Sequence, residues 1–186
     1  MPFFTRWRKE RQLQRHADAY VATLLREPSD ADVAWLAAAA TRGDDDHARW
    51  ELRYARRALG LLVAQRDALD DRTASIVAQV LGSAFEADQH IDQGRFGLAE
   101  RQFNARLSAY RDAIAARSAE TGSRLGQTLL AFSGGSFREV DETVRRVSDV
   151  LAGYESEANE ALRSAFGAAV LPEHVPPSVA AGSSAK

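Results

Sequence analysis

The chain has 186 residues, of which 45% are hydrophobic and 27% are charged, and its formal net charge is −2. This composition is typical of one domain with a substantial core, and the charge gives no overall attraction to nucleic acid. The absence of cysteine excludes disulfides, thiolate metal sites, iron–sulfur clusters and cysteine nucleophiles. No apolar run resembles a secretory signal or reaches the roughly 18–20 residues of a transmembrane helix, so we expect a soluble cytoplasmic protein.

An amphipathic helix is predicted over residues 3–26, because apolar side chains recur there at helical spacing. Pro28 ends this helix, since proline pushes the residue before it out of the helical region. Ser29 is expected to cap a short second helix, and Asp32 completes a carboxylate variant of the capping box. We treat residues 1–28 as an N-terminal helical segment that precedes the main domain.

Two further helices are predicted between residues 44 and 94. The acidic run at 44–46 opens the first of them, because carboxylates in a first turn offset the helix dipole. Thr73 is the expected N-cap of the next helix, and Gln93 and Gly94 are expected to close it. Each helix has one apolar face, so both are expected to pack on a common core.

A long antiparallel helical hairpin is predicted from two apolar stripes that are joined by a Gly-Gly turn. The stripes cover residues 96–133 and 136–170, and both have the spacing of a coiled coil. Gly122 and Gly126 interrupt the first stripe, but its apolar phase continues past them, so we predict one helix with at most a kink. The pattern Ser136-Phe-Arg-Glu139 is a capping box for the second helix.

These elements predict an all-α fold, a bundle of five to six helices built around the coiled-coil-like hairpin. The bundle domain is expected to cover residues 29–171. Residues 172–186 begin with a helix-stopping proline and have no apolar stripe, so they are expected to form a disordered tail.

The predicted hairpin extends beyond the shorter helices, so part of its apolar stripe needs a cover. Either the first two helices provide that cover or a second copy of the chain does. An uncovered stripe of this length marks an interface, so we predict self-association, most simply as a homodimer. The predicted interface residues are Leu125, Leu129, Phe132, Phe137, Val140 and Val144.

A candidate metal site is predicted at one end of the bundle. His47 and Asp88 fall at the centres of the apolar stripes of their helices, and Glu51 and Glu100 fall at the edges of theirs. Antiparallel neighbours would bring these four side chains together, and carboxylates with a histidine are what Fe or Mn takes in ferritin-like bundles. The Glu-x-x-His pattern of such sites is missing. The alternative is that the four side chains are solvated or paired with arginines.

A second candidate site lies in the first 16 residues. Phe3, Phe4 and Trp7 cluster on one side of the predicted helix, and five basic residues accompany them against Glu10 alone. Basic residues with aromatics are typical of a helix that docks on a membrane surface. The aromatics lie about a quarter turn from the apolar stripe that follows them. They therefore either dock on a second surface or cap the bundle as core residues.

No catalytic motif is present in the sequence. It has neither a Gly-x-Ser-x-Gly elbow nor a P-loop, and no recognised DNA-binding motif accompanies its arginines, whose excess over lysine we attribute to genome composition. The predicted function is therefore that of a non-enzymatic helical-bundle interaction or scaffold protein without a cofactor. Two alternatives stay open: a ferritin-like bundle that binds Fe or Mn, and a peripheral membrane adaptor that docks through its N-terminal aromatics.

Overall fold

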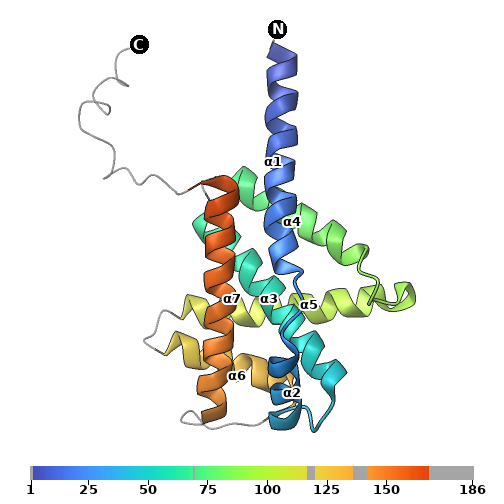
Figure 1. Ribbon diagram of the computed structural model, residues 1–186, viewed down its shortest axis with the longest axis vertical. Coiled ribbons are helices and arrows are strands. Elements are labelled where there is room, and N and C mark those ends of the chain that lie inside the picture. Colours follow the sequence, from blue (N-terminus) through green and yellow to red (C-terminus); the bar gives the residue numbers. More distant parts are fainter. Residues whose placement is uncertain (1, 69, 117–119, 136–141, 168–186) are drawn as a thin grey trace, which may run out of the picture.

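The computed structural model describes residues 2–68, 70–116, 120–135 and 142–167, with the backbone alone for residues 2–6 (Figure 1). Within these ranges the regular secondary structure is all helical and there is no strand, which confirms the predicted all-α class. The elements are α1 (Pro2–Leu24), α2 (Asp30–Ala39), α3 (Asp45–Asp67), α4 (Asp71–Glu86), the 3₁₀ helix η1 (Gln93–Arg95), α5 (Phe96–Ala115), α6 (Thr121–Phe132) and α7 (Glu142–Phe166).

Helix α3 is the central element of the structure. Every residue from Glu51 to Ala64 is buried, because α2, α4, α5 and α7 all pack against this helix. A helix covered on all sides has no solvent-facing stripe for its charged residues. The arginines in the middle of α3 must therefore find partners inside the protein.

The second half of α1 packs into the bundle, and its first half projects beyond the other helices (Figure 1). Tyr20 and Leu24 are buried in a cluster with side chains of α3, α4 and α7. The Tyr20 hydroxyl donates a hydrogen bond to the Gly60 carbonyl oxygen at 2.7 Å. A Cβ at position 60 would lie 2.2 Å from Leu24 Cδ2, so any larger residue there would require the buried Leu24 side chain to shift.

The N-terminal cap of α2 follows the prediction, the acidic run at 44–46 lies at the start of α3 as expected, and the cap of α4 differs from the prediction. Ser29 Oγ accepts a hydrogen bond from the Asp32 backbone N–H at 3.1 Å, and Asp44 caps α3 in the same way. The cap of α4 is Asp70, not Thr73, because the Thr73 backbone N–H donates to Asp70 Oδ1 at 2.6 Å. A carboxylate one turn earlier in the sequence thus takes the capping position.

The predicted single helix over residues 96–132 is wrong, because it is divided into α5 and α6. Helix α5 ends at Ala115 and α6 begins at Thr121, so the chain turns before it reaches Gly122. Helix α6 then packs against both α5 and α7, and α5 and α6 run across α7 in Figure 1. The long antiparallel hairpin is therefore replaced by three shorter helices. The predicted capping box from Ser136 and the predicted tail at 172–186 lie outside the described residues.

Three of the six predicted interface residues are buried within a single chain. Leu125, Leu129 and Val144 are 5%, 0% and 2% exposed, because α6 and α7 cover one another. Phe132 is half-buried, and Phe137 and Val140 lie outside the described residues. These three residues therefore do not belong to an exposed apolar stripe of the kind from which we predicted self-association.

Candidate functional site

Glu51, one of the four predicted metal ligands, is held by an arginine. Its side chain is 2% exposed, and Arg106 Nε donates to Glu51 Oε2 at 2.8 Å. A second hydrogen bond joins Arg106 Nη2 to Glu51 Oε1. His47 Nε2 lies 3.4 Å from the same Oε1 atom. The two-pronged contact with Arg106 neutralises this carboxylate from inside the bundle.

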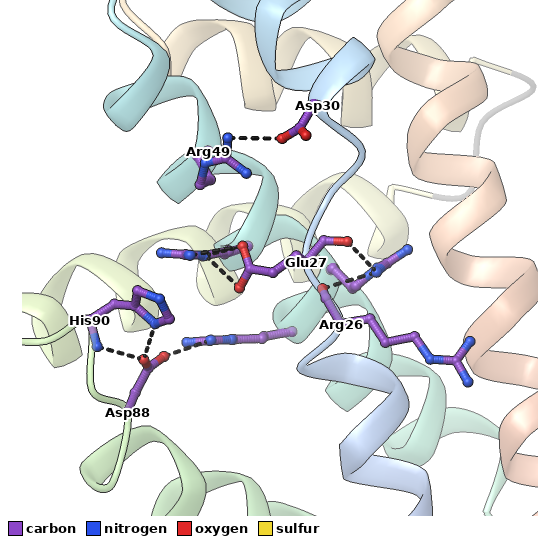
Figure 2. Close-up of polar contacts among 9 residues, drawn as sticks. Arg26, Glu27, Asp30, Arg49, Asp88 and His90 are labelled. Atoms are coloured by element: carbon purple, nitrogen blue, oxygen red, sulfur yellow. Dashed lines mark hydrogen bonds and ion pairs between the residues drawn. The ribbon is translucent and has the colours of Figure 1, made fainter.

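Asp88, another of the predicted metal ligands, forms an ion pair with Arg57 of α3 and not with Arg106. Arg57 Nη2 donates to Asp88 Oδ2 at 2.7 Å, and the His90 backbone N–H and ring Nδ1 lie 3.0 and 2.9 Å from Oδ1 (Figure 2). Burial acts to raise the pKa of Asp88, but the hydrogen bonds from His90 and Arg57 outweigh it and leave this pKa below its usual value. Asp88 is therefore an ionised partner of Arg57.

The four predicted metal ligands do not form one cluster. Glu51 and Asp88 belong to separate ion pairs, and Glu100 is exposed beside a pocket. Across the described ranges, no group of three or more His, Cys, Asp or Glu side chains is arranged to hold a metal ion. The sequence placed the acidic side chains near the core but did not reveal the arginines that neutralise them.

The same pairing recurs at two other arginines of α3. Arg53 donates to both carboxylate oxygens of Glu27, with contacts of 2.8 to 3.1 Å, as Figure 2 shows. Arg56 Nη2 donates to Glu157 Oε2 at 2.9 Å, and Arg56 Nη1 donates to the Arg26 carbonyl oxygen at 3.0 Å. These contacts tie α3 to the α1–α2 connection and to α7.

Each of the buried arginines also lies over an aromatic ring. The pairs are Arg53 over Trp50, Arg56 over Tyr154, Arg57 over Phe85, and Arg106 over Tyr54 and Phe132. A planar guanidinium can stack on a ring while it binds a carboxylate edge-on, which a lysine ammonium cannot do. The arginines of α3 are thus structural. Our attribution of the arginine excess to genome composition missed this role.

The buried tyrosines are poorly suited to act as nucleophiles near neutral pH. Burial, the largest contribution, raises the pKa of Tyr154 to about 12, and it also raises the pKa of Tyr20 and of Tyr110. A phenol with a raised pKa stays protonated at neutral pH. These side chains support packing rather than proton transfer.

An apolar pocket of about 220 Å³ lies between α3, α4 and α5. Its walls include Leu81, Phe85 and Phe103, and its charged members are Arg57, Glu86 and Glu100. Arg57 is already paired with Asp88. The pocket has apolar walls, and the charge of its one arginine is neutralised by Asp88. Its lining residues do not bring an acid, a base and a nucleophile together, as an enzyme active site would.

The first half of α1 carries the most distinctive exposed surface. We call residues 7–15 the arm. Trp7 is 50% exposed, and the bases Arg8, Lys9, Arg11 and Arg15 are all exposed. Arg11 Cζ lies 3.8 Å from the centre of the Trp7 ring. The arm therefore combines an accessible indole with basic groups on a projecting helix (Figure 1). The side chains of Phe3 and Phe4 lie outside the description.

Three of the four basic groups of the arm lie on the side of α1 opposite its buried face. Tyr20 and Leu24 mark the face of α1 that is buried. At about 100° per residue, Arg8, Arg11 and Arg15 fall on the opposite side of the helix. A partner that approaches this side does not meet the rest of the protein first.

The arm is also set apart from the rest of the chain by charge. Residues 1–16 hold five of the 24 basic residues and one of the 26 acidic residues, which leaves 19 basic and 25 acidic residues elsewhere. Glu10 pairs with Arg72 of α4 at 3.2 Å. The four exposed bases of the arm form no ion pair with a carboxylate in the described part of the chain. Their charge is therefore available to a partner.

Comparison with known proteins adds no relative: no protein-family model, curated protein or solved structure matches this chain. In the part of the chain that the structure describes, no helix is both long and apolar enough to cross a bilayer. Function is therefore inferred from the geometry of the arm and of the bundle that carries it.

Proposed function

We propose that the protein is a non-enzymatic helical-bundle interaction protein that binds a negatively charged partner through the arm. The observation that carries this proposal is the exposure of Trp7 and of four bases that form no ion pair among the described residues, on a helix that projects from the bundle. Elsewhere in the described chain, the buried arginines of α3 are compensated by carboxylates. Exposed arginines such as Arg101 and Arg124 also occur elsewhere, but the arm gathers four exposed bases and an exposed indole within nine residues.

Charge separation along the chain favours binding at the arm over binding at the bundle. The residues outside the first 16 have more acidic than basic side chains, so an anionic partner is attracted to the arm and repelled by the remainder. Opposite charges speed association and orient the encounter. Arginine also binds phosphate and carboxylate groups with two parallel hydrogen bonds, which strengthens contact with such a partner.

The arm replaces the α6–α7 stripe as the proposed contact surface. Leu125, Leu129 and Val144 are used to pack one chain, so they are not free for a second molecule. The proposal therefore keeps the predicted interaction function and moves the contact surface to the arm.

Retention on immobilised heparin tests the proposal without assuming the kind of anion. The variant Arg8→Gln/Arg11→Gln/Arg15→Gln removes three bases of the arm, and Arg101→Gln/Arg111→Gln/Arg124→Gln removes three exposed bases of α5 and α6 as a control of equal charge. We expect the wild type and the control to be retained and the arm variant to elute at much lower salt. At about 1 kcal/mol per base, the arm variant loses roughly 100-fold in affinity. Lack of retention of the wild type, or equal loss in both variants, would refute the proposal.

A further inference from the structure

We infer that the anionic partner of the arm is the surface of a lipid bilayer. This inference depends on the proposed function and adds the chemistry of the partner to it. The cytoplasmic leaflet has a negative surface potential that attracts clusters of four to eight basic residues on a helix. The arm supplies Arg8, Lys9, Arg11 and Arg15 as exposed bases within about two turns.

Trp7 favours a bilayer over a nucleic acid. Half of its surface is exposed, and an indole is best accommodated at a membrane–water interface, where one side is apolar and the other is wet. A nucleic acid would use the same ring as a stacking platform. The Arg11 guanidinium already covers one face of the Trp7 ring at 3.8 Å, which leaves the ring edge and the other face for contact.

The surroundings of the arm restrict how it meets a flat anionic surface. Glu10 lies on the arm and pairs with Arg72, and Asp70 and Asp71 are exposed at the start of α4. These carboxylates would repel an anionic surface on the side of the arm that faces α4. The bilayer is therefore met by the outward side that carries Arg8, Arg11 and Arg15, and the acidic bundle is held away from the lipid.

Docking of this kind is reversible and sensitive to salt. Each base near an anionic surface increases affinity about fivefold, so the three bases on the outward side together contribute roughly 100-fold. This attraction is screened within a Debye length of about 8 Å at physiological ionic strength. We expect high salt to release the protein from the membrane.

Co-sedimentation of the full chain with vesicles provides the test. The vesicles contain phosphatidylcholine alone or phosphatidylcholine with phosphatidylserine, and the proteins are the wild type, the arm variant, the α5–α6 control and Trp7→Phe. We expect the wild type and the control to bind only vesicles that contain phosphatidylserine. The arm variant should bind these vesicles roughly 100-fold more weakly. Circular dichroism of each variant confirms that the helical fold is kept.

Quenching by brominated lipid tests whether Trp7 reaches the interface. Trp35 and Trp50 are only partly exposed and lie within the bundle, so the difference between wild type and Trp7→Phe isolates the signal of Trp7. We expect the wild type to be quenched on binding and Trp7→Phe to show little quenching. Binding without a difference between the two proteins would overturn the placement of Trp7 in the lipid interface.

The two tests separate failure of this inference from failure of the proposed function. A wild-type protein that is retained on heparin but does not bind phosphatidylserine vesicles would overturn the lipid assignment and leave the interaction function intact. Binding of a single-stranded oligonucleotide that is lost in the arm variant would then identify nucleic acid as the partner. Failure on both heparin and vesicles would refute both proposals.

Discussion

Arg106 and Glu51 form a buried ion pair that joins α5 to α3 at the centre of the bundle. Arg106 Nε donates to Glu51 Oε2 at 2.8 Å, and the two side chains are 10% and 2% exposed. The Arg106 guanidinium also lies 4.4 Å from the Phe132 ring of α6. One arginine thus connects three helices. Removing either member of the pair takes from the other its two-pronged, oppositely charged partner, although His47 still lies near Glu51 and the Gln102 carbonyl still accepts from Arg106.

The first prediction concerns this ion pair. We expect Glu51→Leu and Arg106→Met each to lower the free energy of unfolding by about 3–5 kcal/mol, since each leaves an uncompensated buried charge. The double variant should be more stable than either single variant, because it removes both charges together. Urea unfolding followed by circular dichroism gives the three values. If the double variant loses as much free energy of unfolding as the two single variants together, Glu51 and Arg106 do not act as a pair.

The second prediction compares two buried tyrosines that differ in hydrogen bonding. The Tyr20 hydroxyl donates to the Gly60 carbonyl oxygen at 2.7 Å, whereas the Tyr110 hydroxyl has no hydrogen-bond partner among the described residues. We expect Tyr20→Phe to lower the free energy of unfolding by about 1 kcal/mol, and Tyr110→Phe to leave it unchanged or raise it. Thermal and urea unfolding check both values. Equal losses in the two variants would show that hydrogen bonding does not distinguish them.

The third prediction compares two glycines of α6. A Cβ at Gly126 would lie 2.8 Å from the Val144 backbone oxygen, and no such neighbour lies within 4 Å of a Cβ at Gly122. Backbone cannot move aside as a flexible side chain can, so Gly126→Ala should separate α6 from α7 and destabilise the protein by about 1–3 kcal/mol. Gly122→Ala should stabilise it by up to about 1 kcal/mol, because alanine favours the helix. Unfolding midpoints that move in the same direction would disprove this contrast.

The fourth prediction concerns pH. The pKa of Asp88 is lowered in the folded protein, so its contribution to stability is complete above its unfolded pKa of about 3.9 and is lost as the pH falls through the lower, folded pKa. We expect Asp88→Asn to flatten the loss of unfolding free energy below about pH 4. The exposed Asp112 provides a matched control in Asp112→Asn. If Asp88→Asn loses unfolding free energy below about pH 4 as steeply as the wild type does, carboxylates other than Asp88 determine the acid dependence.

Local signals in the sequence predicted the helical class and where several helices begin, but not where α4 ends: it ends at Glu86, and Gln93 and Gly94 belong to η1. The cap at Ser29 forms as expected, because a cap depends on residues within one turn of each other. The arm was also found from local composition. The break between α5 and α6 was missed, since the apolar spacing continues in phase through Leu125 and gives no signal for the turn that precedes Thr121.

The candidate metal site shows why side-chain partners were harder to predict than helices. The sequence correctly places Glu51 on a face of α3 that is buried, but its partner Arg106 is 55 residues away. Arg56 and Glu157 are separated by 101 residues. Helical periodicity identifies the face on which a charge lies and contains no information about which distant charge meets it.

By itself, the sequence determined that the chain is helical, where several helices begin, and that positive charge and aromatics gather at residues 1–16, because these properties arise from neighbours along the chain. The tertiary structure decided that Arg57 and Arg106 neutralise the buried carboxylates Asp88 and Glu51. It also decided that Leu125, Leu129 and Val144 are buried within one chain, and that Trp7 is exposed while Tyr20 is not. These outcomes depend on which helices meet in space. The contacts that bury a side chain or neutralise a charge form only when distant segments pack together.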